Sequence, residues 1–175
     1  EKPASPLAAN LLRSRVMLKA TIFREYDIRG VADVDLPSEG IQLLGQAIGT
    51  YLQRKAGKKI NLGRDCRLSG PRLRDALLAG LVASGCEVTD LGVVPTPALY
   101  FSCMHMHADG GVQITGSHNP ADYNGFKVVC GKTTIFGEEI QKIYQMIVSG
   151  DLASGPGSVK QGVIIDDYVD NVASY

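Results

Sequence analysis

The sequence predicts an α/β fold, arranged as a three-layer α/β/α sandwich around a mixed, mostly parallel sheet. Two observations support this prediction. Short apolar runs that suit strands alternate along the chain with longer segments whose apolar residues recur at helical spacing. Turns that contain glycine or proline separate these segments. Such alternation is typical of a sheet covered by helices on both faces, with a ligand site at the carboxyl ends of the strands.

Apolar spacing and boundary residues place the individual elements. Ser38 and Ser69 are the expected N-caps of the first two helices, because a serine hydroxyl can accept a hydrogen bond from the first helical turn. Gly85 is expected to end the second helix, since glycine readily adopts the left-handed conformation found after helix ends. In chain order, we expect a helix at 38–55, a strand at 59–63, a helix at 70–84, a strand at 86–90, a helix at 98–107, strands at 111–115 and 126–130, a helix at 137–149 and the start of a helix at 166–175.

Turn and linker signals lie between these elements. Pro95 and Pro97 are expected to bracket a turn. The dipeptide Asn124-Gly125 predicts a tight turn just before the strand that follows it. Segment 150–158 is rich in glycine, serine and proline, so it predicts a linker or the edge of a domain.

Composition and charge argue against several classes of protein. Eighteen basic residues balance eighteen acidic residues, so the overall charge favours neither nucleic acid nor an anionic membrane as a partner. No apolar run approaches the roughly 18 residues of a membrane-spanning helix. Residues 1–20 predict a flexible tail, since they lack the apolar core of a signal peptide. The four cysteines form no C-x-x-C pair, which indicates small, buried, reduced side chains and a cytoplasmic location.

One polar segment follows an apolar strand directly and presents a small hydroxyl group. It reads Thr115-Gly116-Ser117-His118-Asn119-Pro120, and the sequence D-Y-N-G-F-K follows at 122–127. Gly116 permits a backbone conformation that other residues resist, and the proline stiffens the exit from the segment. Such a loop can hold the Ser117 hydroxyl forward at the end of a sheet.

Two alternative interpretations of this segment are an ordinary polar turn and the nucleophile loop of a serine hydrolase. An ordinary polar turn that ends a strand is the favoured interpretation of any isolated Ser-His pair. A serine hydrolase is disfavoured, because the nucleophile elbow needs glycine two residues on either side of the serine, where this chain has Thr115 and Asn119. His118 is also poorly placed to accept the Ser117 proton, because adjacent residues point apart in extended chain.

A nucleotide-binding P-loop is a third alternative, suggested by the sequence G-K-T at 131–133. The motif requires a glycine five residues before its second glycine, and that position is Phe126. The segment also follows an expected hairpin, whereas a P-loop joins a strand to a helix. We therefore reject this interpretation.

Segment 115–120 resembles the phosphoserine loop of the α-D-phosphohexomutases, whose usual form is T-[AG]-S-H-N-P. The continuation at 122–127 most resembles the phosphomannomutase/phosphoglucomutase branch of that family. The likeness covers roughly residues 22–150, because three further blocks resemble the family in the right order. These blocks are F-R-E-Y-D-I-R-G at 23–30, G-R-D-C-R-L-S-G at 63–70 and G-V-V-P-T-P at 92–97.

The resemblance implies a reaction and the residues that carry it. Members of the family interconvert hexose 1-phosphate and hexose 6-phosphate, here of mannose, glucose or both, through a phosphoserine and a bisphosphorylated sugar. Ser117 would be the phosphoryl carrier. His118, Lys127 and Arg29 would be the charged catalytic groups around the phosphate, since phosphoryl transfer depends on positioning and on neutralising negative charge. Tyr26, Arg29 and Lys127 would bind the substrate.

Four further residues would support the serine segment without touching the substrate. Thr115 and Asn119 flank the serine within the segment itself. Arg64 and Asp65 are expected to pair and to hold the segment in place by a charge-assisted hydrogen bond.

The resemblance also implies Mg²⁺, with glucose 1,6-bisphosphate as an activator. The family binds the metal with three aspartates of a D-x-D-x-D-R loop, which does not occur in this chain. Ser117 would contribute a metal ligand only through the oxygen of its phosphate. The metal and sugar ligands would come from downstream domains of the same protein, and the hexose phosphate would bind between the domains.

The expected domain organisation is a tail at 1–20, the phosphoserine domain at 21–158, and a connection at 159–175 that begins the helix leading to a missing second domain. We expect the chain to be the first domain of a multi-domain enzyme, inactive by itself and able to self-associate through exposed apolar surface. The alternative is a non-catalytic module that binds or senses sugar phosphates.

Overall fold

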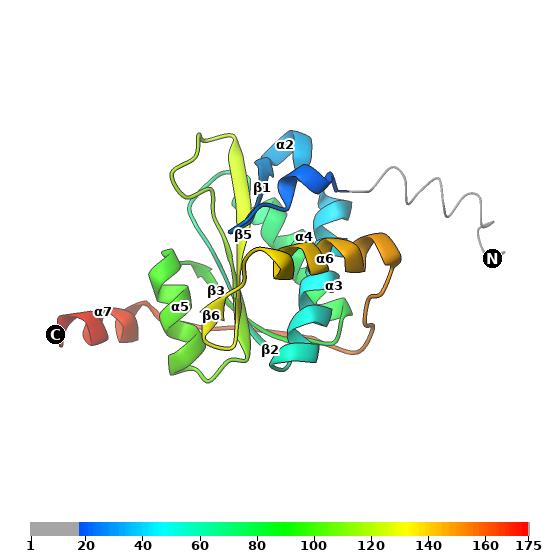
Figure 1. Cartoon of the computed structure of the whole chain (residues 1–175). Coiled ribbons are helices and arrows are strands. Elements are labelled where there is room, and N and C mark those ends of the chain that lie inside the picture. Colours follow the sequence, from blue (N-terminus) through cyan, green and yellow to red (C-terminus); the bar gives the residue numbers. More distant parts are fainter. Residues whose placement is uncertain (1–17, 175) are drawn as a thin grey trace.

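A seven-stranded sheet divides the molecule into two helical layers (Figure 1). The structure, a computed structural model, describes residues 18–174. Its elements are η1 (Ala20–Ile22), β1 (Ile28–Val31), α2 (Ala32–Asp35), α3 (Ser38–Lys55), β2 (Lys59–Arg64), α4 (Gly70–Ala83), β3 (Glu87–Val93), α5 (Thr96–His105), β4 (Gly110–Ile114), β5 (Tyr123–Cys130), β6 (Thr133–Thr134), α6 (Glu138–Ser149), β7 (Ser158–Gln161) and α7 (Ile165–Ala173).

The strand order is β1-β5-β4-β2-β3-β7, and the short strand β6 pairs with β5. Every pairing of β5 is antiparallel, and the other pairings are parallel. Among the described strands, β5 alone therefore runs against the common direction. This arrangement confirms the predicted mixed, mostly parallel sheet. It also brings the carboxyl ends of β4, β2 and β3 to one edge.

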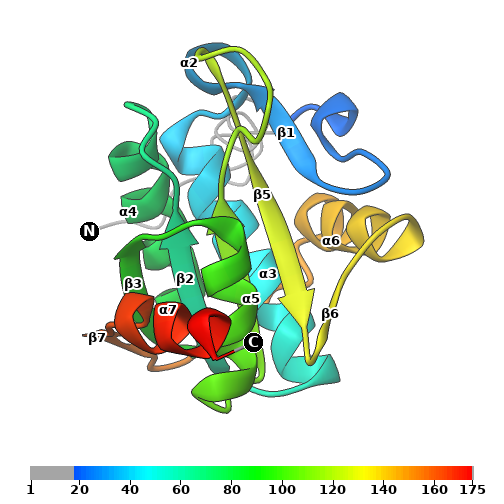
Figure 2. The same ribbon diagram turned by 90° about the vertical axis from the view of Figure 1, so that its left-hand side faces the viewer.

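The two helical layers are unequal. Helices α3, α4 and α6 lie on one side of the sheet, and α5 and α7 lie on the other (Figure 1). The second view shows α5 and α7 over the part of the sheet that contains β2 and β3, with no helix in front of β1 (Figure 2). The three-layer prediction is confirmed, but the layer of α5 and α7 leaves one end of the sheet open. No helix within residues 18–174 is long and apolar enough to cross a membrane.

Helix α3 supplies the main apolar stripe of the larger core. Ile41, Leu44, Ile48 and Leu52 follow helical spacing and are completely buried. Helix α4 packs closely on α3, because a Cβ atom added at Gly80 would overlap the carbonyl oxygen of Gln42. The absence of a side chain therefore sets the distance between the two helices.

The structure corrects the predicted helix boundaries in detail. Pro37 occupies the N-cap position of α3, so Ser38 is its first helical residue and makes no capping hydrogen bond. Ser69 is the N-cap of α4, but its hydroxyl accepts a hydrogen bond from Asn124 Nδ2 at 2.9 Å and caps nothing. Pro95 and Pro97 do not bracket a turn, because Pro95 is the N-cap of α5 and Pro97 lies in its first turn.

The predicted tight turn at Asn124-Gly125 is wrong, because both residues lie inside β5. Strand β1 pairs with β5 at this point, and a Cβ atom at Gly125 would lie 2.6 Å from the carbonyl oxygen of Ile28. Glycine is therefore required by the close approach of a neighbouring strand. Asn124 is fully buried and donates to Ser69.

Strand β7 was not predicted; it adds a parallel strand to the edge of the sheet beside β3. Asp90 of β3 connects this strand to α4 and β7. Its carboxylate accepts hydrogen bonds from Arg74 of α4, from Gln161 of β7 at 3.3 Å and from the Gly92 N–H at 3.0 Å. Burial alone would raise the pKa of Asp90, but the bonds from Arg74 and Gly92 bring it below its ordinary value.

The predicted tail lies partly within the described residues, and the predicted linker at 150–158 lies wholly within them. Residues 1–17 of the predicted tail lie outside the described residues. Leu18 is buried in the larger core, so the folded part includes at least some of the predicted tail. Strand β7 carries the sheet past residue 158. The domain boundary predicted after this residue stays a prediction.

The four cysteines are free thiols with different surroundings. Cys86 and Cys103 are buried, as predicted, and burial raises the pKa of Cys103 to about 11. Cys130 is half-buried. Cys66 is exposed in the loop after β2, so the expectation of buried cysteines is wrong at this position.

Candidate active site

Two loops meet at the carboxyl edge of the sheet. We name residues 65–69, between β2 and α4, the arginine loop, and residues 115–122, between β4 and β5, the serine loop. Strands β2 and β4 are parallel neighbours, with Arg64 opposite Ile114, so both loops leave the sheet at the same level. The Asp65 N–H donates to the carbonyl oxygen of Ile114 at 2.9 Å and joins the two exits.

The serine loop fixes its backbone and leaves its hydroxyl free. Ser117 has a φ angle of +52°, in the left-handed region that residues other than glycine seldom adopt. Its N–H donates to Thr115 Oγ1 at 2.9 Å. Asn119 donates to the Gly116 carbonyl oxygen from its backbone at 2.9 Å and from its side chain at 2.8 Å. The Ser117 side chain is exposed, so an ordered main chain presents an accessible oxygen.

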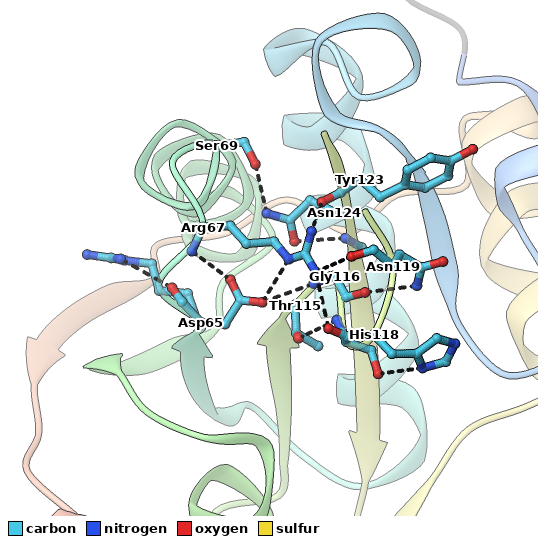
Figure 3. A network of polar contacts seen from close by, with 12 residues as sticks. Asp65, Arg67, Ser69, Thr115, Gly116, His118, Asn119, Tyr123 and Asn124 are labelled. Atoms are coloured by element: carbon cyan, nitrogen blue, oxygen red, sulfur yellow. Dashed lines mark hydrogen bonds and ion pairs between the residues drawn. The ribbon is translucent and has the colours of Figure 1, made fainter. Parts of the chain in front are cut away.

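The guanidinium group of Arg67 reaches from the arginine loop into the serine loop (Figure 3). Its Nη2 atom donates to the carbonyl oxygens of Ser117 at 3.1 Å and Asn119 at 2.7 Å. Its Nη1 atom donates to the carbonyl oxygens of Pro120 and, at 3.0 Å, of Tyr123. One side chain therefore binds four carbonyl groups in and next to the serine loop.

Asp65 is the counter-ion of Arg67. Its Oδ2 atom lies 3.3 Å from Arg67 Nε and accepts the Gly116 N–H at 3.0 Å, while Oδ1 accepts the Arg67 N–H at 3.1 Å. The sequence had paired Asp65 with Arg64, but Arg64 makes only a 3.5 Å contact to the Asp65 carbonyl oxygen. The ion pair that ties the loops together is Asp65–Arg67. Sequence reasoning missed Arg67, although it lies in the second of the three further blocks, at 63–70.

Ser117 and His118 lie side by side but are only loosely associated. The Ser117 Oγ atom is 3.4 Å from His118 Nδ1, and both side chains are exposed. This distance is longer than an ordinary hydrogen bond between such groups. The imidazole can therefore turn toward another oxygen without loss of a structural bond.

A second polar group lies on β1, β5 and the turn before β1. Asp27 lies between two cations, with Oδ1 at 3.7 Å from Arg29 Nε and Oδ2 at 3.9 Å from Lys127 Nζ. Arg29 is opposite Gly125, two residues before Lys127, so both cations point to the same face of the sheet. The adjacent Tyr26 is 72 % exposed. Sequence reasoning missed Asp27, which stands between two predicted site residues in the first block.

This second group is poised to accept a negative ligand. The Arg29 Nε–H is buried and has no hydrogen-bond partner within the described chain. A buried donor that is left unpaired is costly, so an acceptor is expected to complete it. Within residues 18–174, no hydrogen bond or ion pair joins Arg29 or Lys127 to Ser117 or His118.

The described residues provide no metal site of their own. No group of three or more histidine, cysteine, aspartate or glutamate side chains within residues 18–174 could hold a metal ion. The two carboxylates nearest the site, Asp27 and Asp65, are already occupied by cationic side chains.

Comparison with known proteins connects this geometry to a family. Residues 20–154 match the family model described as "Phosphoglucomutase/phosphomannomutase, alpha/beta/alpha domain I". The chain belongs to this family. The match confirms the resemblance found in the four sequence blocks. The family's domain I has an alpha/beta/alpha layer order, and this chain has the same order.

Individual relatives show how far the similarity extends. A phosphomannomutase/phosphoglucomutase of Pseudomonas aeruginosa is 48% identical over 151 residues, which are 86% of this chain and 33% of that protein. A phosphoglucomutase of Neisseria meningitidis serogroup B is 41% identical over 156 residues, 88% of this chain and 34% of that protein. A solved structure of a phosphoglucomutase/phosphomannomutase family protein from Burkholderia thailandensis has a TM-score of 0.85 and 39% identity, covering 90% of this chain and 36% of that one. The chain spans about one third of the length of the curated relatives it matches.

Proposed function

We propose that this chain is the phosphoserine-bearing domain of a phosphohexomutase that interconverts hexose 1-phosphate and hexose 6-phosphate, with glucose, mannose or both as the sugar. The observation that carries the proposal is the exposed Ser117 hydroxyl on a loop whose backbone is held by hydrogen bonds on both sides of the serine, at the carboxyl edge of the sheet. The names of the relatives support the reaction class.

Ser117 carries the phosphoryl group in this mechanism. The bond between its Oγ atom and phosphorus breaks as a sugar hydroxyl oxygen forms a new bond to the same phosphorus, and the proton of that hydroxyl ends on Ser117 Oγ, which becomes a free hydroxyl again. The product is a bisphosphorylated sugar. After this intermediate has turned over, the Ser117 oxygen takes the other phosphoryl group, and the isomeric monophosphate leaves.

The cations of the site would neutralise the phosphate oxygens. A phosphoserine carries about −1.5 to −2 charges at neutral pH, so transfer requires positive groups around it. Arg29 and Lys127 would bind phosphate oxygens on the open face of the sheet. His118, next to the carrier, would hold or move the proton of the reacting hydroxyl. Tyr26 would contact the sugar.

Mg²⁺ fits this chain only through the phosphate oxygen on Ser117, because the described residues offer no acidic cluster. When bound, the metal would neutralise charge on the transferring phosphoryl group. The remaining metal ligands and the sugar-binding groups would come from downstream domains, in keeping with the length of the relatives. Glucose 1,6-bisphosphate would load the serine as an activator.

We further propose a cytoplasmic location, which the free thiols support. Exposed apolar side chains at and near the carboxyl edge would contact the downstream domains and would let this chain self-associate when it is alone. These side chains are Tyr26, Leu68, Val93 and Phe136.

The test is the intact mass of the longer protein before and after incubation with glucose 1,6-bisphosphate and Mg²⁺. We expect a gain of one phosphate, about 80 Da, that Ser117→Ala abolishes. Ser154→Ala, which alters an exposed serine in the linker, is the matched control and should keep the gain. Failure of the wild-type protein to gain mass, together with retained binding of hexose phosphate, would favour the non-catalytic module. The 175-residue chain alone should show no isomerisation.

A further inference from the structure

We propose that Arg67 is a positioning residue that holds Ser117 in its left-handed conformation and thereby aims the hydroxyl. The importance of this role for catalysis rests on the proposed function, whereas the geometry does not depend on it. The proposal begins with the backbone of Ser117, whose φ of +52° is unfavourable for a residue with a Cβ atom. Such a conformation persists only where the surroundings impose it.

The peptide groups before and after Ser117 are each held by a side chain. Thr115 Oγ1 accepts the Ser117 N–H and fixes the peptide that precedes the serine. The peptide that follows it is bound at its carbonyl oxygen by Arg67 Nη2. The bonds of Asn119 close the turn at Gly116 and do not reach the Ser117 carbonyl group. Arg67 is therefore the side chain that sets the exit direction of the chain at Ser117.

Arginine suits this task because its guanidinium group offers five N–H donors in a rigid plane. Here Nη1 and Nη2 serve four carbonyl oxygens, and Nε faces Asp65. Asp65 also accepts the Arg67 N–H and the Gly116 N–H, so the same carboxylate holds the backbone of both the arginine loop and the serine loop. A lysine offers a single charged atom in this space and cannot span the same oxygens.

Gly116 explains how the guanidinium group comes so close. A Cβ atom at this position would overlap the Nε and Cζ atoms of Arg67. The planar group therefore packs on the bare Cα of the residue before the serine. Replacing Gly116 with alanine should displace Arg67 while leaving every side chain of the contact present, which provides an independent way to break it.

The test compares backbone geometry in the 175-residue chain by NMR, using couplings that report the sign of φ at Ser117. In Arg67→Ala and Gly116→Ala we expect Ser117 to lose its positive φ, and the Asn119 amide to exchange with solvent about tenfold faster or more. Arg72→Ala is the matched control. Arg72 also donates to carbonyl oxygens, those of Ala32 at 2.9 Å and Leu36 at 2.8 Å, but contacts no part of the serine loop.

Kinetics of the longer protein separate positioning from general stability. Arg67→Lys should lower kcat by about 10- to 100-fold with KM changed by less than about threefold, because a misplaced reacting oxygen affects the chemical step. A positive φ at Ser117 that survives both Arg67→Ala and Gly116→Ala would overturn the proposal, as would an equal loss in Arg72→Ala. If Arg67→Ala fails to fold, Gly116→Ala and Arg67→Lys decide the question. A loss of positive φ in a protein that never takes up phosphate would support the role of Arg67 and refute the phosphoryl-carrier function instead.

Discussion

Replacing Ser117 with glycine should make the protein more stable while removing its reactive hydroxyl. A left-handed backbone costs an L-residue about 1–2 kcal/mol, and glycine avoids that cost. Glycine also gives the unfolded chain more conformational freedom, which lowers the free energy of unfolding by about 0.4–1 kcal/mol. The loop contacts of Ser117 involve its N–H and carbonyl groups, and both remain in the variant. We therefore expect a gain in the free energy of unfolding of about 0.5–1 kcal/mol.

Two further variants calibrate this expectation. Ser117→Ala also lacks the hydroxyl but keeps the left-handed cost, so its free energy of unfolding should stay within about 0.5 kcal/mol of the wild type. His107→Gly changes an exposed residue with the same φ of +52°, placed just after α5 and away from the site. It should gain about as much stability as Ser117→Gly.

The assay is urea denaturation of the 175-residue chain at neutral pH, with the slope of each transition compared to confirm that only stability has changed. A thermal scan should show the same order, since about 1 kcal/mol corresponds to about 2–4 °C in a protein of this size. The reasoning is refuted if His107→Gly is stabilised but Ser117→Gly is no more stable than Ser117→Ala. In that case, the serine loop would not keep its left-handed conformation in solution.

Three other substitutions test separate parts of the structure. Gly80→Ala should lower the free energy of unfolding by about 1–3 kcal/mol in denaturant titrations, because the added Cβ atom meets the Gln42 carbonyl group. This loss should appear although alanine favours helices more than glycine does. An unchanged midpoint would contradict the close packing of α3 on α4. Asp90→Asn should cost about 2–3 kcal/mol at pH 7. Folding lowers the pKa of Asp90 below its ordinary value of 3.8, so the difference in the free energy of unfolding between Asp90→Asn and the wild type should persist at pH 5 and shrink only as the pH falls below 3.8. A difference that stays constant down to pH 2 would exclude the Asp90 carboxylate as its cause. Asp27→Asn should lower the rate of phosphoryl transfer in the longer protein about tenfold, because Arg29 and Lys127 lose the carboxylate that positions them. The free energy of unfolding should change by less than about 1 kcal/mol, since both ion pairs are long and partly exposed. An unchanged rate would remove Asp27 from the site.

The sequence predicted best those elements whose burial leaves a periodic apolar signal. The bounds predicted for α3 match the structure, because its fully buried residues recur every three or four positions. Strand β7 left no such signal, since all four of its residues are exposed. The dipeptide Asn124-Gly125 was misread because the need for a residue without a Cβ atom arises equally in a turn and beside a close strand.

The candidate site shows a similar division. The serine loop was found from local residues, because its function depends on a contiguous segment. The partner of Asp65 was assigned wrongly because Arg64 is its neighbour in the chain. Strand β2 ends at Arg64, and Asp65 pairs with Arg67 across the bend of the arginine loop, where the alternation of side chains in a strand no longer applies. Its four carbonyl contacts depend on the meeting of two loops about 50 residues apart, which no local pattern reveals.

Strand β7 has a mechanical consequence for the edge of the sheet. Within the described chain its ladder joins it to β3 alone, and the parallel pairing runs from Ser158 to Gln161. A tensile load applied along this strand acts on the ladder in shear, so its bonds must yield together. A load applied across the sheet opens the same bonds one at a time. Asp90 binds both Gln161 and the Gly92 N–H, so tension along β7 is delivered to the carboxyl end of β3, which lies at the same edge of the sheet as the candidate active site.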